Sequence, residues 1–145
     1  MKNQALITLY KTNYSAIPTN LEGVSDVESL KTSGNGENNI NWILGHIVSS
    51  RDTIHEKMGL PLICNNTIKK TYGRGSSSTN TENAISLAEM LKTLESSQEM
   101  ILAAIPEIDD VDVIKRIAFY GFHEAYHVGQ LGLMRKIIGK KGAIA

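Results

Sequence analysis

The sequence predicts an all-α fold, a four-helix bundle with long crossover loops, formed as one domain over residues 1–145. Three observations predict it. Apolar residues recur at three- and four-residue spacing in four long stretches, which is the periodicity of amphipathic helices. Proline and glycine stand at the ends of these stretches, where they stop helices. A chain of this length can bury one hydrophobic core.

The first two helices are bounded by stop signals. The first is expected over residues 3–17 and ends at Pro18, because proline lacks the N–H that a helix interior needs. The second is expected over residues 39–58, where isoleucine, leucine and methionine form one apolar face. Gly59 and Pro61 follow directly and are typical of a helix C-terminus.

The third and fourth helices carry start signals as well. The third is expected over residues 79–104, because Thr79 and Glu82 have capping-box spacing. The fourth is expected over residues 109–138, with two acidic residues at its positive end. Glycines at positions 121, 129 and 132 predict close approach of a neighbouring helix. Glycine otherwise costs up to about 1 kcal/mol in a helix interior.

The connections between these helices are uneven. Residues 18–38 and 59–78 form two long segments, and the second contains a Gly-Arg-Gly-Ser-Ser-Ser run at 73–78 that we expect to be flexible. Long connections in a compact domain are often crossovers or functional loops. They argue against a bundle with hairpin-like turns throughout.

Composition excludes several classes of function. Fifteen basic residues balance fifteen acidic ones, so no basic surface for nucleic acid is expected. No apolar run reaches the length of a membrane span, and no signal peptide is recognisable. The single cysteine, Cys64, suits a reducing compartment, so a cytoplasmic location is expected. Together these observations predict no membrane partner and no nucleic-acid partner.

Two histidines of the fourth helix are spaced to bind one metal ion. His123 and His127 are four residues apart, which places their Cβ atoms about 5–6 Å apart on one helix face. Two such imidazoles can converge on an ion at about 2.0–2.1 Å from each nitrogen. The alternative is a pair of core or surface histidines without a metal. The metal is favoured because this stretch offers few other polar partners and an unpaired buried imidazole is costly.

Residues 123–127 read His-Glu-Ala-Tyr-His, which matches the zinc-protease helix motif. Those proteases take a third ligand from downstream, and no Glu, Asp or His follows His127 here. A third ligand must therefore come from upstream, from His46 or His55. Helical periodicity places His55 nearer the centre of the apolar face, so it does not select His46.

The chain resembles a known family in these segments. Asn-Trp-Ile-Leu-Gly-His at 41–46 and His-Glu-Ala-Tyr-His-Val-Gly-Gln at 123–130 are similar to motifs of the DinB/YfiT-like metalloenzyme superfamily. The resemblance implies that His46, His123 and His127 hold a divalent transition metal, zinc or nickel. It also implies a bundle topology that differs from the simple up-down form, and a homodimer.

The resemblance extends to chemistry. Three protein nitrogens leave a position open for water or substrate, as in catalytic metal sites. Characterised relatives use bacillithiol, mycothiol or glutathione, so a thiol-dependent S-transferase is the leading expectation, and a hydrolase stays open. Glu124 is a candidate general base, and Gln130 is a candidate for orienting a ligand histidine. The alternative is a non-catalytic bundle whose metal site is structural or vestigial and which acts as an interaction module.

Overall fold

The computed structural model describes residues 2–78 and 82–144, and over these residues it contains six α-helices, one short 3-10 helix and no strand. The elements in chain order are α1 (Gln4–Leu21), α2 (Asp26–Ser29), α3 (Ile40–Met58), α4 (Asn66–Tyr72), α5 (Leu87–Ala104), η1 (Ile105–Glu107) and α6 (Val111–Ile137). The prediction of an all-α fold is therefore confirmed.

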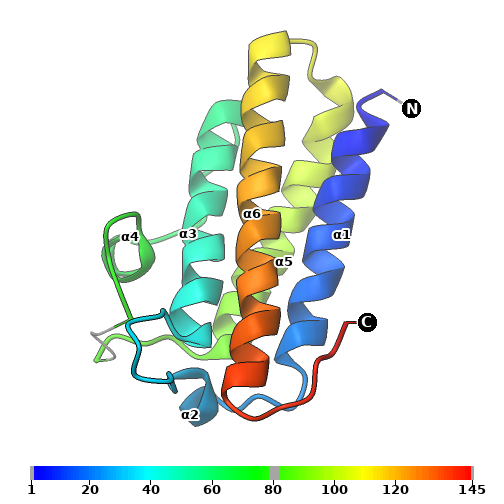
Figure 1. Ribbon diagram of the computed structural model, residues 1–145. Coiled ribbons are helices and arrows are strands. Elements are labelled where there is room, and N and C mark those ends of the chain that lie inside the picture. The colour runs from blue at the N-terminus through cyan, green and yellow to red at the C-terminus, as the bar shows by residue number, and fades with distance from the viewer. Residues whose placement is uncertain (1, 79–81, 145) are drawn as a thin grey trace.

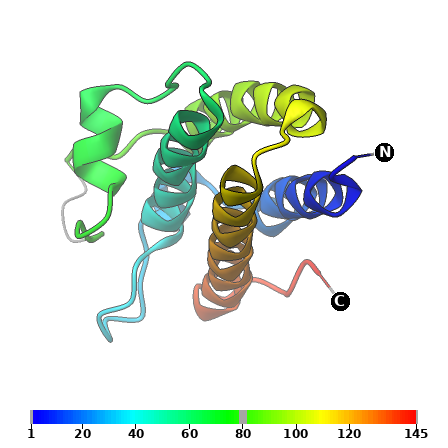
Figure 2. The same ribbon diagram turned by 90° about the horizontal axis from the view of Figure 1, so that it is seen from above.

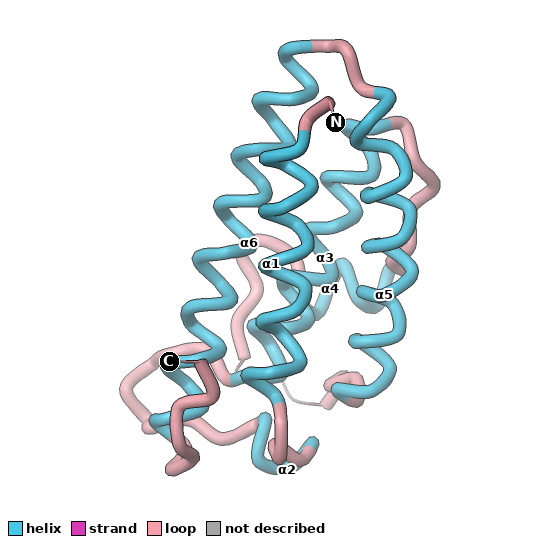
Figure 3. The backbone as a smooth tube through the Cα atoms, turned by 90° about the vertical axis from the view of Figure 1, so that its right-hand side faces the viewer, coloured by secondary structure: helices cyan, strands magenta, loops and turns pink. Residues whose placement is uncertain are grey.

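Four long helices, α1, α3, α5 and α6, lie side by side along the long axis of the molecule (Figure 1). In that view α1 and α6 run downward, whereas α3 and α5 run upward. Both α5 and α6 pack against α1 and α3, and the side view places α1 between α5 and α6 (Figure 3). Because α3 and α5 run the same way, the connection between them must return along the whole height of the helices. Its length follows from that requirement.

The short helices occupy the long connections. From above, α4 stands outside the group of long helices and packs beside α3 (Figure 2). The run at 73–78 after α4, whose flexibility stays a prediction, makes hydrogen bonds to the start of α3. The indole Nε1 of Trp42 donates to Ser76 Oγ at 3.0 Å, and the backbone N–H of Asn39 donates to Ser78 Oγ at 3.2 Å. These bonds anchor the loop to the start of α3.

Side chains cap the helices that frame the site. The Asn39 side chain accepts a backbone N–H of the first turn of α3, and Gly59 ends that helix with a left-handed φ of 69°. The Asp110 side chain accepts two backbone N–H groups at the start of α6. The predicted bounds of these two helices are confirmed to within a residue or two.

Two other predicted bounds were wrong. α1 continues past Pro18 to Leu21, since the missing N–H removes only one bond near the helix end. The predicted start at Thr79 lies outside the described residues, but α5 begins only at Leu87, with Ser86 as its N-cap. The residues just before it are held away from helical geometry by side-chain bonds from Asn41 and Tyr72 to the backbone of Ile85.

Two of the three glycines in α6 face a close neighbour. A Cβ at Gly121 would meet Leu9 Cδ2 at 2.6 Å, and one at Gly132 would meet Asn20 Oδ1 at 3.3 Å. A Cβ at Gly129 would meet nothing within 4 Å, so the prediction of close approach was wrong there. Gly129 lies on the exposed face of the helix.

The core consists of two apolar clusters with a polar layer between them. The larger cluster joins the start of α3 and α5 to the end of α1 and α6, and the smaller one lies at the opposite end. Each long helix contributes one buried polar side chain to the layer, namely Asn13, Arg51, Gln98 and Glu124. Every polar atom of this layer is satisfied, because no buried side-chain N or O of the described residues lacks a hydrogen-bond partner.

Candidate metal centre

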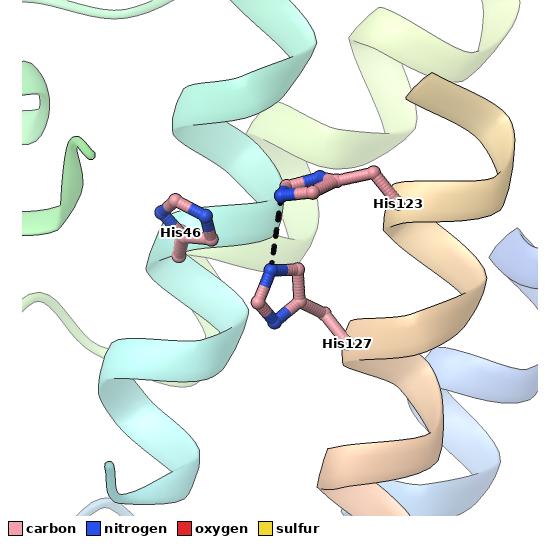
Figure 4. Close-up of side chains that lie close together, drawn as sticks. All are labelled: His46, His123 and His127. Atoms are coloured by element: carbon pink, nitrogen blue, oxygen red, sulfur yellow. Dashed lines mark hydrogen bonds between the residues drawn. The ribbon is translucent and has the colours of Figure 1, made fainter. Parts of the chain in front are cut away.

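Three histidines from two helices come together at the contact between α3 and α6 (Figure 4). His46 lies on α3, and His123 and His127 lie one turn apart on α6. One nitrogen of each ring lies within 4.8 Å of the other two, a separation that no other trio of metal-ligating side chains in the described residues achieves. Their ring centroids are 4.5–5.4 Å apart. The structure therefore places all three predicted ligands in one cluster.

His46 is fixed from two sides. Its Nδ1 donates to the backbone carbonyl of Tyr72, the last residue of α4, at 2.8 Å. Its ring also stacks on Trp42, with centroids 4.7 Å apart and planes 8° from parallel. Because Nδ1 carries the proton, Nε2 is the ring nitrogen with a free lone pair. In Figure 4 one ring nitrogen of His46 points away from the other two histidines, and the other ring nitrogen faces His123 and His127.

His127 is fixed in the same tautomer. Its Nδ1 donates to Gln130 Oε1 at 2.7 Å, one turn further along α6. Its Nε2 lies 3.1 Å from Nε2 of His123, and one proton between them makes this a hydrogen bond. Since the His127 proton is held on Nδ1, His123 donates from Nε2. No described residue forms a hydrogen bond with Nδ1 of His123. Its proton can therefore move from Nε2 to Nδ1, which changes the tautomer.

The surroundings of all three imidazoles disfavour the protonated form and lower each pKa. Burial lowers the pKa of His46, and burial together with the charges of His46 and Arg74 lowers the pKa of His123. Burial, helped by repulsion from the other two rings, lowers the pKa of His127 to about 4, although the bond to Gln130 acts in the opposite direction. A metal ligand must be unprotonated, so these shifts favour metal binding near neutral pH.

The donor set and its spacing fit a divalent transition metal. Imidazole nitrogens suit zinc, nickel and copper. At bonds of about 2.0–2.1 Å, tetrahedral ligands lie about 3.3 Å apart. The 3.1 Å between the two Nε2 atoms on α6 is close to that value. The three nitrogens lie within 4.8 Å of one another, so the rings would have to draw closer to share one ion.

A pocket of about 360 Å³ opens beside two of the three imidazoles. Its lining combines two histidines, three hydroxyls, one cation and two aromatic rings, namely His46, Ser49, Ser50, Thr53, Arg74, Phe119, Tyr120 and His123. This volume lies in the range of small-molecule sites. The cluster therefore has space for a ligand next to it.

Comparison with known proteins agrees with this geometry. The family model of the DinB superfamily matches residues 9–131, which is most of the chain and includes all three histidines. The chain belongs to the DinB superfamily. No curated protein and no solved structure matches it. None of the helices that the structure describes is both long enough and apolar enough to cross a bilayer.

The fourth histidine of this DinB-superfamily chain lies apart from the cluster. His55 is fully buried, and its Nδ1 donates to the carbonyl of Pro61 at 2.6 Å. Its Nε2 accepts from the hydroxyl of Ser97 at 2.8 Å. Both ring nitrogens are thus used, and His55 is a satisfied core residue. The resemblance to the family, rather than helical periodicity, distinguished it from His46.

Glu124 points away from the cluster into the polar layer. Its two carboxylate oxygens accept from Nε and Nη2 of Arg51 at 2.6 and 2.9 Å, and both side chains are buried. Arg51 also donates to Gln98 at 3.0 Å and lies over the Tyr10 ring. The carboxylate is therefore held in a core ion pair, a position that does not support its candidacy as general base at the metal.

Gln130 and Cys64 lie in different surroundings. Gln130 Oε1 accepts from Nδ1 of His127, which is the contact that an orienting role would require. Cys64 packs on the larger apolar cluster, and its thiol donates to the carbonyl of Val48 at 3.5 Å. Burial and the neighbouring Asp52 raise the pKa of this thiol to about 12, so Cys64 is not a reactive thiolate.

Sequence reasoning missed the residues that hold the cluster from outside the two ligand helices. Tyr72 contributes a backbone carbonyl, which no side-chain pattern reveals. Its hydroxyl accepts the N–H of Ile85 at 2.7 Å and donates to Asn41 at 2.9 Å, while Asn41 Nδ2 donates to the Ile85 carbonyl. Gly45 is the residue from which this contact could have been predicted. A Cβ there would overlap the Tyr72 ring, so a glycine directly before His46 marks where α4 packs.

Proposed function

We propose that this chain binds one divalent transition metal, zinc or nickel, through Nε2 of His46, His123 and His127, within a four-helix bundle of crossover topology. The observation that carries the proposal is the fixed tautomer of two ligands. His46 and His127 are both held by Nδ1 to protein acceptors, which leaves Nε2 of each ring unprotonated on the side where the three rings meet. Such outer partners are typical of metal-ligating histidines.

We propose further that the metal is catalytic and that the reaction is transfer to a low-molecular-weight thiol. The pocket beside His46 and His123 supports a substrate next to the ion. A bound divalent ion would lower the pKa of a thiol and favour its thiolate. In the transfer, the sulfur would form a bond to an electrophilic carbon and the leaving group would depart with its electron pair. The thiol proton would pass to water.

Metal analysis of purified variants tests the site. His46→Ala, His123→Ala and His127→Ala should each lose most of the bound metal, because two imidazoles bind far more weakly than three. His55→Gln is the matched control and should keep wild-type occupancy. Full occupancy in any of the three alanine variants would show that the assigned ligand set is wrong.

A cobalt-substituted protein tests the open position. Adding glutathione, bacillithiol or a simple thiol should produce a sulfur-to-metal charge-transfer band, and the His46→Ala protein should give none. Cys64→Ser is needed in parallel and should leave the band unchanged. A wild-type spectrum that ignores every thiol and small anion would favour the competing function, a structural metal in an interaction module.

We also propose that the chain is a cytoplasmic homodimer. Five large apolar side chains on α6 are 41–64% exposed, and they are Phe119, Phe122, Tyr126, Leu133 and Ile137. At about 100° per residue they fall within an arc of about 60° on one face of the helix. We call this set the α6 stripe. A stripe of this kind can pack against its own copy about a two-fold axis.

A further inference from the structure

We infer that the pocket beside the histidine cluster binds a small organic anion, a carboxylate or a phosphate, with Arg74 and the hydroxyls of Ser49, Ser50 and Thr53 as its recognition groups. The inference deepens the proposed function, because it assigns the class of thiol or co-substrate that the pocket selects. The anion site itself does not require the metal, which would only position the reacting end of the ligand.

The first support is an uncompensated positive charge. Arg74 lines the pocket, and it makes no ion pair or side-chain hydrogen bond with any residue that the structure describes. No residue in the pocket lining is acidic. A bound divalent ion would add to this positive potential. The pocket therefore attracts anions, and a guanidinium can hold a carboxylate or phosphate with two parallel hydrogen bonds.

The second support is a stripe of hydroxyls without protein partners. Ser49, Ser50 and Thr53 follow His46 by three, four and seven residues, so all four side chains share one face of α3. Some of the other helical hydroxyls of this chain donate back to the preceding turn. Those of Thr8, Thr19 and Thr93 do so at 2.9, 3.0 and 3.2 Å.

The three hydroxyls on α3 make no such bond with the described residues, although they are only partly exposed. Their donors and acceptors are therefore available to a ligand in the pocket. Combined with Arg74, they would supply several hydrogen bonds to an anionic group.

The opposite wall sets the shape of the ligand. Phe119 and Tyr120 of α6 line it together with His123. Their rings provide apolar surface for a short carbon chain, while the hydroxyls and Arg74 supply the polar side. A suitable ligand is thus a small molecule with an acidic group at Arg74 and a metal-binding atom toward the histidines. An anionic thiol has this form, whereas a neutral thiol lacks the first contact.

A pair of matched thiols tests the assignment on the cobalt-substituted protein. Mercaptopropionate and its neutral analogue mercaptopropanol are titrated against wild type, Arg74→Gln and Arg74→Lys, with the charge-transfer band as readout. In Arg74→Gln, mercaptopropionate should bind about tenfold more weakly, as expected for loss of a charged hydrogen bond. Mercaptopropanol should be unaffected, and Arg74→Lys should recover part of the loss. Lys70→Gln removes an exposed cation outside the pocket and should change neither titration.

A metal-free experiment separates this inference from the proposed function. Chelator-treated protein is titrated with glutarate and with inorganic phosphate, and the amide NMR signals of Ser49, Ser50 and Thr53 are followed. Shifts for either anion that disappear in Arg74→Gln support the inference even if no thiol reaches the cobalt. Equal binding of both thiols and both anions by wild type and Arg74→Gln would overturn it, whatever the metal does.

Discussion

At the scale of single residues, the proton on each imidazole decides how the cluster can accept a metal. His46 and His127 hold theirs on Nδ1, against Tyr72 and Gln130. His123 holds its proton on Nε2, between the two rings of α6. To become a ligand through Nε2, His123 must move that proton to Nδ1. In the proposed site two ligands are therefore preset, and one would change tautomer on metal binding.

The Gln130 side chain should control metal affinity without touching the metal. Gln130→Ala removes the acceptor that fixes His127, so metal affinity should fall by about 10–100-fold, the usual cost of losing an outer partner. Competition with a chromophoric chelator measures the change. Tyr126→Phe is the control, because it removes only the 3.5 Å contact to the other end of the same amide. Equal affinity in wild type and Gln130→Ala would contradict the orienting role.

Stability of the metal-free protein should depend on the same histidines. The pKa of His127 is about 4 in the folded chain, below the ordinary value of about 6.5 for an unfolded one. Between these values the unfolded chain binds more protons, so the free energy of unfolding rises with pH. The contribution is complete above about pH 6.5 and is lost as pH falls toward about 4.

Denaturant unfolding over this pH range checks the sign. Wild type should lose stability on acidification, and His127→Gln should lose less over the same interval. The lowered pKa values of His46 and His123 act in the same direction. Parallel pH profiles for the two proteins would show that His127 titrates normally in the folded state.

The ligand residues could be predicted from sequence only in part. The spacing of His123 and His127 indicates a shared ion, but choosing His46 over His55 required the likeness to a family. Periodicity failed because it reports burial, and His55 is the more buried of the two, with 0% exposure against 8%. The carbonyl of Tyr72 and the charge of Arg74 come from a connection whose path depends on tertiary contacts.

At the scale of helices, the packing of α4 on α3 should determine both stability and metal binding. Gly45→Ala would place a methyl group in the buried Tyr72 ring, whose hydroxyl bonds prevent it from moving away. Overpacking of this kind costs about 1–3 kcal/mol of unfolding free energy. The displaced Tyr72 carbonyl should also release His46 and weaken metal binding. Chemical unfolding and metal titration measure the two effects.

Gly129→Ala is the matched control for that substitution. It adds the same methyl group in a helix interior where, apart from the adjoining backbone of α6, no atom of the described residues lies within 4 Å. Its metal affinity should be that of wild type, and its stability should rise by up to about 1 kcal/mol. Equal behaviour of the two alanine variants would show that contact with α4 does not matter.

The ion pair between α3 and α6 should matter for folding rather than for chemistry. Glu124→Gln or Arg51→Met leaves one buried charge without its partner and should cost about 3–5 kcal/mol of unfolding free energy. The double variant Arg51→Met/Glu124→Leu should recover much of this loss, because no charge then stays buried. Asp112→Asn removes an exposed pair with Lys115 and should have no measurable effect. A stable Glu124→Gln protein that has lost only activity would instead restore the general-base hypothesis.

Helix identity and most helix ends were accessible from sequence. Apolar periodicity located all four long helices, and local caps fixed the ends of α3 and α6. The error at the start of α5 came from non-local bonds. The start of α5 is set by Ser86 after a segment that Tyr72 and Asn41 hold extended, and neither contact can be read from neighbouring residues.

At the scale of the whole molecule, the α6 stripe should mediate self-association. Leu133→Asp places a charge in the stripe and should convert a dimer to a monomer in sedimentation equilibrium. Leu62 is comparably exposed at 54% but lies in the connection before α4, so Leu62→Asp should stay dimeric. A monomeric wild type at micromolar concentration, or a dimeric Leu133→Asp, would rule out this interface.

The polar layer between the two apolar clusters has a consequence for which ion the protein selects. Apolar contacts tolerate the sliding of one helix along another. A helix that shifts by one residue moves about 1.5 Å and turns by about 100°, and this movement breaks directional hydrogen bonds. Glu124 and the two ligands of α6 share one turn, and Arg51 lies on α3 just beyond His46. The helices that carry the three histidines are therefore held in register by the core rather than by the metal. Discrimination between ions would then follow ionic radius and preferred coordination geometry, because a shift of the helices to suit a larger ion would break these bonds.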